Sequence, residues 1–263
     1  MPTLAAVYLC DARAVRRIAP VLALVLALAG CGGDDSSSGG GSSSQPLVVS
    51  AAASLTDALT ACSKQFDGAR VRLSFAGSDE LAAQIRQGVK PDVYAAANTT
   101  LPDQLAKEGL LDKPVTFATN ELVIAVPGDS DIKSINDLAK RGTKLVIGSE
   151  TVPVGSYTRQ VLGRLPSGEQ QQIMDNVRSN EPDVKGVVGK LTRGAADAGF
   201  VYRTDLADGL KAVTLPHDLQ PVVEYGAGVV KGAKNADMAQ QYLDGLTSGP
   251  CADALRSAGF GSP

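Results

Sequence analysis

The chain has 263 residues, a net charge of −3, 44% hydrophobic but only 4% aromatic residues, no Trp and one His. This mildly acidic balance provides no basic surface for binding nucleic acid. No Gly-x-Ser-x-Gly, Walker, His-Glu-x-x-His or Cys-x-x-Cys motif is present, and the one histidine, His217, lies in a predicted turn. We therefore expect neither an enzyme nor a metal site of nitrogen and sulfur ligands.

The first thirty residues have the features of a secretory signal peptide. Arg13, Arg16 and Arg17 form a positive region, and an almost purely apolar run follows from 18 to 29. About a dozen apolar residues are too few to span a bilayer comfortably but suit a cleaved signal. We interpret residues 1–30 as a signal peptide and expect no later segment to cross a membrane.

The signal ends in Leu28-Ala29-Gly30-Cys31, which resembles the lipobox of bacterial lipoproteins. In such proteins the signal is cut before the Cys, which then carries the lipid. The residues that follow Cys31 are almost all Gly, Ser and Asp, a composition typical of a flexible tether. The resemblance implies lipidation of Cys31 and a tether over 31–46; an ordinary signal peptide with a chance Cys is the alternative.

Short apolar runs alternate with helical periodicity from residue 46 onward. Strands are predicted at 46–50, 70–75, 92–97, 120–126, 144–147, 198–202, 212–215 and 222–230. Helices are predicted at 55–66, 79–87, 101–108, 135–140, 156–165, 184–192, 238–246 and 252–257. Strands separated by helices indicate an α/β protein with parallel sheets built from βαβ units.

Two cysteines, Cys62 and Cys251, remain once Cys10 is removed with the signal and Cys31 is assigned to the lipid. An even pair in an oxidising compartment favours a disulfide, with two buried thiols as the alternative. The bridge would close a loop of nearly the whole domain, which chain entropy credits with roughly 4–5 kcal/mol. It also implies that the first helix packs beside the last.

Two predicted strands run directly into helices that begin near Ser54 and Ser78. Helix N-termini carry unpaired backbone N–H groups and partial positive charge, so a hydroxyl beside them completes an anion cradle without any cation. The alternative is that each serine is only an N-cap, with Ser54 and Asp57 forming a capping box. Their shared position favours anion binding, because open α/β sheets bind ligands at the carboxyl ends of their strands.

Six blocks along the chain carry a resemblance to a known family. They are Ala-Ala-Ala-Ser-Leu-Thr at 51–56, Phe-Ala-Gly-Ser at 75–78, Pro-Asp-Val-Tyr-Ala-Ala-Ala-Asn at 91–98, Val-Pro-Val-Gly-Ser-Tyr at 152–157, Asp-Val-Lys-Gly at 183–186 and Gly-Phe-Val-Tyr at 199–202. In this order they resemble the periplasmic molybdate-binding proteins. The resemblance implies a two-lobed, type II periplasmic-binding-protein fold, each lobe a mainly parallel sheet flanked by helices, joined by a two-stranded hinge. Lobe 1 would comprise 47–118 and 222–263, and lobe 2 would comprise 119–221.

The resemblance also implies a set of oxyanion contacts. Ser54 and Ser78 would bind through hydroxyl and main-chain N–H groups of the first lobe. Val154 and Val184 would contribute backbone N–H groups of the second lobe, with Val154 just before the helix at 156. Tyr202 would donate its phenolic hydroxyl; the residues alone favour the alternative, a buried strand aromatic whose hydroxyl satisfies a backbone group.

The implied function is that of an extracytoplasmic lipoprotein, a monomer anchored to the cell membrane, that captures molybdate or tungstate by closing its lobes. It would deliver this ligand to the permease of an ABC importer, with no cofactor, no direct metal-ion ligands and no nucleic acid. A site made only of N–H and O–H donors favours a fully deprotonated oxyanion over hydrogen phosphate. Sulfate, another small oxyanion or an organic carboxylate remains the alternative ligand. We expect Asp57, Asp79 and Glu80 to point away from a bound dianion, because a facing carboxylate would be costly.

Overall fold

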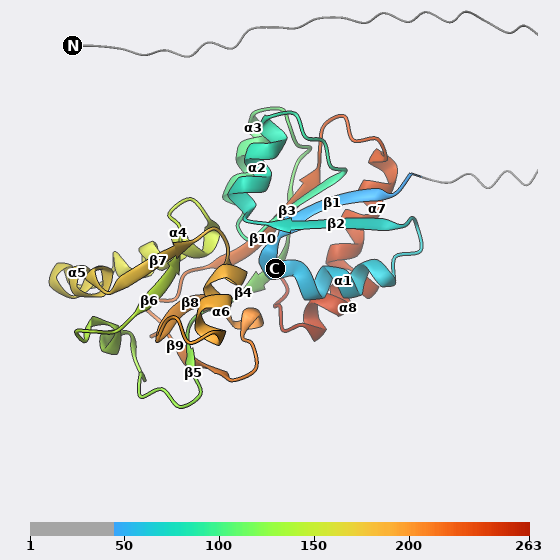
Figure 1. The fold of residues 1–263 in the computed structure, drawn as a ribbon. Helices are drawn as coiled ribbons and strands as arrows, with labels where there is room; N and C mark the ends of the chain where they lie inside the picture. Colours follow the sequence, from blue (N-terminus) through green and yellow to red (C-terminus); the bar gives the residue numbers. More distant parts are fainter. Residues whose placement is uncertain (1–44) are drawn as a thin grey trace, which may run out of the picture. The chain divides into compact units, whose positions relative to one another are not determined.

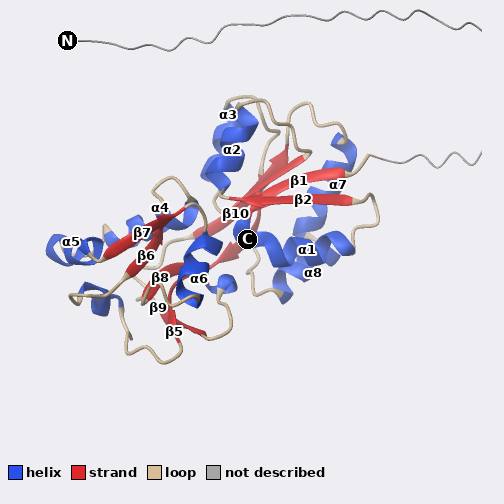
Figure 2. Ribbon diagram, in the orientation of Figure 1, coloured by secondary structure: helices blue, strands red, loops and turns tan. Residues whose placement is uncertain are grey.

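The computed structural model describes residues 45–263. The predicted signal peptide, Cys31 and almost all of the predicted tether lie outside these residues. The described chain forms two five-stranded sheets, each flanked by helices (Figures 1 and 2). None of its helices is both long enough and apolar enough to cross a membrane.

The first sheet has the strand order β2-β1-β3-β10-β4. Its strands are β1 (Leu47–Ala52), β2 (Val71–Ala76), β3 (Val93–Ala96), β4 (Val115–Asn120) and β10 (Val223–Val229). Its helices are η1 (Ala53–Leu55), α1 (Thr56–Lys64), α2 (Ser78–Arg86), α3 (Thr100–Lys107), α7 (Ala236–Thr247) and α8 (Pro250–Ser257). We call this sheet and these helices lobe 1.

Helices cover both faces of the first sheet, and β3 shows how its residues divide between them. Val93 and Ala95 pack into the core formed with α1, α7 and α8, whereas Tyr94 and Ala96 pack into a second core with α2 and α3. A strand buried on both faces is apolar at every position instead of alternating. This is why β3, and β1 apart from Ser50, read as apolar runs in the sequence.

The second sheet has the strand order β7-β6-β8-β5-β9. Its strands are β5 (Leu122–Pro127), β6 (Leu145–Gly148), β7 (Val177–Glu181), β8 (Ala198–Tyr202) and β9 (Leu210–Thr214). Its helices are η2 (Ile135–Ala139), α4 (Pro153–Leu162), α5 (Ser167–Asp175), α6 (Val184–Thr192) and η3 (Arg203–Asp205). We call this sheet and these helices lobe 2.

The chain passes between the lobes twice, from β4 to β5 and from β9 to β10. The strand that follows each passage, β5 or β10, runs antiparallel to both of its neighbours. The remaining neighbours are parallel, as expected for βαβ units. Both sheets are therefore mixed rather than mainly parallel.

Four elements differ from the sequence prediction: β4, β7, α4 and α5. The strand predicted at 120–126 corresponds to β5, which begins at Leu122, whereas β4, which ends at Asn120 in the other sheet, was not predicted. Strand β7 and helix α5 were not predicted; both are largely polar, and Ile173 is the single buried residue of α5. Helix α4 begins at Pro153 instead of 156, because proline is well suited to the first helical position.

Cys62 of α1 and Cys251 of α8 form a disulfide, with 4.4 Å between their Cα atoms and 189 residues between them in sequence. Both residues are buried, at 0% and 4% exposure. The bridge fixes α1 against α8, so that the first and last helices of lobe 1 lie side by side (Figure 1).

Candidate anion-binding site

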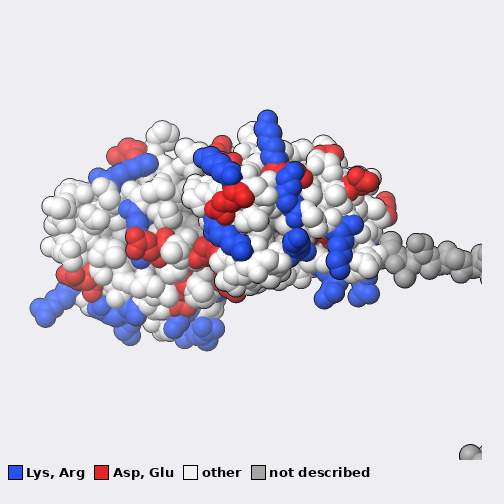
Figure 3. All heavy atoms as spheres, turned by 90° about the horizontal axis from the view of Figure 1, so that it is seen from above, with Lys and Arg blue, Asp and Glu red and all other residues white. Residues whose placement is uncertain are grey.

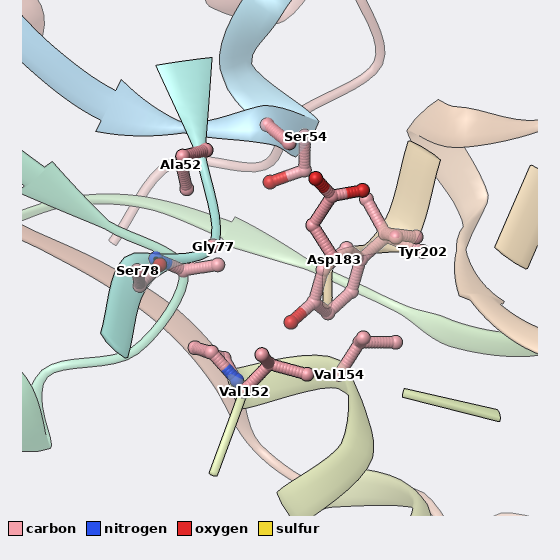
Figure 4. Close-up of a pocket in the computed structure, with 13 residues that line it drawn as sticks. Ala52, Ser54, Gly77, Ser78, Val152, Val154, Asp183 and Tyr202 are labelled. Atoms are coloured by element: carbon pink, nitrogen blue, oxygen red, sulfur yellow. The ribbon is translucent and has the colours of Figure 1, made fainter. Parts of the chain in front are cut away.

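A small cavity lies where the two lobes meet, and residues of both lobes line it. The lining residues are Ala52, Ala53, Ser54, Ala76, Gly77, Ser78 and Ala97 of lobe 1, and Val152, Pro153, Val154, Asp183, Val184 and Tyr202 of lobe 2. Figure 4 shows Ser54 above the cavity, Ser78 to its left, Val152 and Val154 below and Tyr202 to its right. The cavity volume is about 20 Å³. Sites for drug-sized molecules have several hundred Å³, so only a compact ligand of a few atoms fits here.

Four helical segments begin at this cavity. In lobe 1 these are η1, which leads into α1, and α2, which begins at Ser78; in lobe 2 they are α4 and α6. The first backbone N–H groups of a helix have no partner within the helix and carry partial positive charge. Their convergence gives the cavity a positive potential with no lysine or arginine in its lining, which suits a small anion.

The Ser54 hydroxyl lies near the start of η1, and Ser54 as a whole is buried, with 6% of its surface exposed. Its oxygen accepts a hydrogen bond from the Tyr225 hydroxyl at 3.1 Å. Helix α1 begins at Thr56, its N-cap is Leu55, and no side chain caps it. The capping-box alternative for Ser54 and Asp57 is therefore wrong, because the 3-10 turn places Ser54 before the cap position.

The Ser78 hydroxyl occupies an equivalent place at the start of α2. Its oxygen accepts a hydrogen bond from the backbone N–H of Ala97 at 3.1 Å. The N-cap of α2 is Gly77, so Ser78 is the first helical residue and its side chain caps nothing. Each serine thus uses its oxygen as an acceptor for a protein group, which leaves its proton available to donate into the cavity.

The Tyr202 hydroxyl is the third side-chain donor at the cavity. Tyr202 is 1% exposed, and among the described residues no group forms a hydrogen bond with its hydroxyl oxygen. Burial raises the pKa of Tyr202 well above its usual value, so the phenol stays protonated. The ring is held edge-to-face between Tyr157 and Tyr225, with centroid distances of 6.5 and 5.8 Å. A buried phenol that lacks an acceptor among the described residues can donate a hydrogen bond to an anion in the cavity.

Val154 and Val184 bring backbone donors to the cavity from lobe 2. Val184 is the first residue of α6, as expected. Val154 is the second residue of α4 and not a residue before the helix, because α4 begins at Pro153. Proline has no N–H, so Val154 has the first backbone donor of α4.

One carboxylate lines the cavity, and the prediction of an all-neutral site is wrong in this respect. Asp183 is the N-cap of α6, and its Oδ1 accepts a hydrogen bond from the backbone N–H of Gly186 at 2.8 Å. The N-terminus of α6 offsets part of this negative charge. An Asp directly before a predicted helix is an N-cap signal, so the sequence could have identified this residue.

Asp57, Asp79 and Glu80 do not line the cavity, as expected. Asp57 forms an ion pair with Lys185 of lobe 2, with 3.4 Å between Oδ2 and Nζ. The same Nζ lies 3.0 Å from Oδ1 of Asp205, whose side chain is fully buried. Loss of hydration raises the pKa of Asp205 to about 6. Lys185 thus neutralises two carboxylates instead of entering the cavity.

The described residues contain no group of three His, Cys, Asp or Glu side chains that could hold a metal ion. The cavity is built from hydrogen-bond donors on two lobes, and residues 47–261 match the family described as bacterial extracellular solute-binding proteins. The chain belongs to this family. Solute-binding proteins of this family act outside the cytoplasm and are not enzymes.

Individual members of the family resemble this solute-binding protein over most of its length. The molybdate-binding protein ModA of Mycobacterium tuberculosis is 36% identical over 223 residues, covering 81% of this chain and 83% of ModA. ModA of Escherichia coli is 32% identical over 226 residues, covering 80% and 86% of the two chains. These matches confirm the resemblance to the periplasmic molybdate-binding proteins.

The fold also matches solved structures of binding proteins. The periplasmic molybdate-binding protein of Azotobacter vinelandii superposes with a TM-score of 0.71 at 24% identity, covering 82% of this solute-binding protein and 99% of that chain. The predicted two-lobed, type II periplasmic-binding-protein fold is therefore confirmed, apart from the mixed character of its sheets.

Proposed function

We propose that this protein captures molybdate, and tungstate equally, outside the cytoplasm and delivers it to the permease of an ABC importer. The observation that carries the proposal is the cavity: Ser54, Ser78 and Tyr202 present hydroxyl donors, and Val154 and Val184 lie in the first turns of α4 and α6 there. A fully deprotonated tetrahedral dianion accepts hydrogen bonds at every oxygen, so it fits such a set of donors. The relatives named above carry molybdate in their printed names, which supports this choice of ligand.

Capture follows from the division of the donors between the lobes. We propose that residues 47–118 with 222–263 and residues 119–221 move as two rigid bodies about the two strand passages. An anion bound to one lobe alone reaches only part of the donors, so the ligand favours the closed form. Molybdate is then a transported ligand and not a cofactor, and the protein works as a monomer.

Calorimetric titration of the purified protein with molybdate, tungstate, sulfate and phosphate tests the ligand. We expect tight binding of the first two, and its loss when Ser54→Ala is combined with Ser78→Ala. Ser74→Ala, which changes an exposed serine of β2, serves as the matched control and should bind normally. Tight sulfate binding would replace molybdate by sulfate as the ligand, and no binding of any of the four would refute an oxyanion receptor.

The membrane anchor is a separate part of the proposal and depends on Cys31. A lipid on this residue, followed by the tether at 31–46, would hold the binding protein near its permease. Replacing it in Cys31→Ser should move the protein from the membrane fraction to the soluble extracytoplasmic fraction. If the variant stays in the membrane fraction, the anchor assignment is wrong, whereas the oxyanion site is unaffected.

The surface is consistent with a small-molecule role. On the face drawn in Figure 3, acidic and basic side chains are interspersed, with no continuous basic surface.

A further inference from the structure

Behind Ser54 lies a chain of hydrogen bonds that leads away from the cavity toward the passage between the lobes. Tyr225 of β10 donates to Ser54 Oγ at 3.1 Å, and Asn120 at the end of β4 directs its side-chain Nδ2 at the Tyr225 hydroxyl at 3.3 Å. Neither Asn120 nor Tyr225 lines the cavity. The hydroxyl of Tyr225 therefore reaches a ligand through Ser54, whereas its ring packs against Tyr202 and is kept in a phenylalanine variant.

The orientation of the Asn120 amide is fixed by its other contacts. Its Oδ1 accepts a hydrogen bond from the backbone N–H of Glu121 at 2.8 Å, so its Nδ2 faces the opposite direction. That nitrogen also donates to Thr204 Oγ1 of lobe 2 at 2.8 Å. An amide nitrogen can donate but cannot accept, so Tyr225 must accept from Asn120.

The fixed orientation of the Asn120 amide also fixes the direction of the hydrogen bond from Tyr225 to Ser54. Because the Tyr225 oxygen accepts a hydrogen bond from Asn120, its own O–H donates to Ser54. Burial raises the pKa of Tyr225 well above its usual value, so that proton is always present. The Ser54 oxygen then accepts from Tyr225 and cannot donate back to it, which leaves the Ser54 proton for the cavity.

We propose that Asn120 and Tyr225 are positioning residues that hold the Ser54 hydroxyl as a donor toward a deprotonated oxyanion. The proposal rests on the proposed function and deepens it, because it names residues outside the cavity that select which protonation state of the ligand binds. If the direction of these hydrogen bonds were reversed, Ser54 would donate to Tyr225 and present a lone pair to the ligand. A lone pair repels molybdate but accepts a hydrogen bond from the O–H group of hydrogen phosphate.

The isosteric variant Asn120→Asp reverses the direction of both hydrogen bonds, because a carboxylate at this position accepts a hydrogen bond from the Tyr225 hydroxyl. It keeps the acceptor for the backbone N–H of Glu121, and the titration is run at pH 8, well above the usual pKa of an aspartate. We expect molybdate to bind about ten- to a hundredfold more weakly, the range for losing one hydrogen bond to a charged group. Hydrogen phosphate should lose less, so the preference for molybdate over phosphate should fall.

A double-mutant cycle separates this effect from simple charge repulsion. In Tyr225→Phe the connection to Ser54 is broken, so adding Asn120→Asp should cost less than about threefold, whereas direct repulsion would persist unchanged. A second cycle, Tyr225→Phe with Ser54→Ala, should show coupling for the same reason and does not need the aspartate. Tyr242→Phe removes a buried hydroxyl that contacts Ser63 far along α1, and it should leave binding unchanged.

The outcomes are distinct when each variant is first checked for a cooperative unfolding transition. Loss of molybdate affinity in Asn120→Asp that disappears in the Tyr225→Phe background supports the proposal. An equal cost in both backgrounds, no cost at all, or an absence of coupling in the second cycle overturns it while leaving the oxyanion receptor intact. If the unaltered protein binds none of the four anions, the proposed function fails, and this inference fails with it.

Discussion

Replacing Tyr202 by phenylalanine tests whether the cavity is a ligand site or only a packing defect. The hydroxyl has no hydrogen-bond partner among the described residues, so Tyr202→Phe removes no interaction within the protein. The free energy of unfolding of the ligand-free protein should therefore change by less than about 0.5 kcal/mol. Binding should change much more, because a hydrogen bond to a charged ligand contributes about 1.5–3 kcal/mol, or roughly 10- to 150-fold in Kd.

The control is a tyrosine whose hydroxyl has a protein partner. The Tyr242 hydroxyl lies 3.3 Å from Ser63 Oγ, and its ring packs against Phe66. Tyr242→Phe should lower the free energy of unfolding by about 1 kcal/mol and leave the molybdate affinity unchanged. Urea unfolding and calorimetric titration measure the two quantities. If Tyr202→Phe leaves the Kd unchanged, or weakens binding only in proportion to lost stability, Tyr202 is a structural residue and our account of it is wrong.

Three further predictions concern burial, space and the disulfide. The pKa of Asp205 rises from 3.8 to about 6 through loss of hydration, which corresponds to roughly 3 kcal/mol against the ionised form. The native state then binds more protons than the unfolded state, so stability should fall as pH rises from about 4 to 6, and Asp205→Asn should lack this loss in thermal unfolding across that range. A methyl group at Gly77 would meet a backbone oxygen of lobe 2 at 2.5 Å. Gly77→Ala should hold the lobes apart and weaken molybdate binding about tenfold with little change in unfolding, whereas Gly168→Ala, where the space is open, should change neither. Finally, Cys62→Ala with Cys251→Ala should lower the free energy of unfolding by about 5 kcal/mol, because the bridge closes a loop across 189 residues; a loss below 1 kcal/mol in urea would contradict the chain-entropy argument.

The parts of the fold that the sequence predicts are those with a strong apolar pattern. β1 and β3 are buried on both faces, and α1, α2 and α6 have one apolar face, so each lies close to its predicted position. The division between β4 and β5 is not visible in the sequence. Asn120 and Glu121 are flanked by strand-forming residues, and no Gly or Pro marks the change of sheet. β7 escaped prediction because half-exposed, polar strands carry little period-2 signal.

The sequence likewise predicts only some of the residues that form the site. Helix starts after strands pointed to Ser54 and Ser78, but Val154, Val184 and Tyr202 came from the resemblance alone. No local pattern predicts that a residue 171 positions away donates to Ser54, because such partners are set by tertiary packing. Local rules instead favoured capping, since the sequence around Ser54 satisfies the capping-box spacing.

The ion pair between the lobes is too weak to hold the proposed closed form by itself. Lys185 and Asp57 form an ion pair between the lobes, but Asp57 is 82% exposed, so the pair contributes less than about 1 kcal/mol and is screened by salt. Shifting a population from 1% to 99% closed needs about 5.5 kcal/mol of preferential binding. Hydrogen bonds to a charged ligand from donors on both lobes, at about 1.5 kcal/mol or more each, reach this total when four or five form together. An anion that engages only one lobe supplies too little, so closure selects a ligand that all of the donors can reach at once.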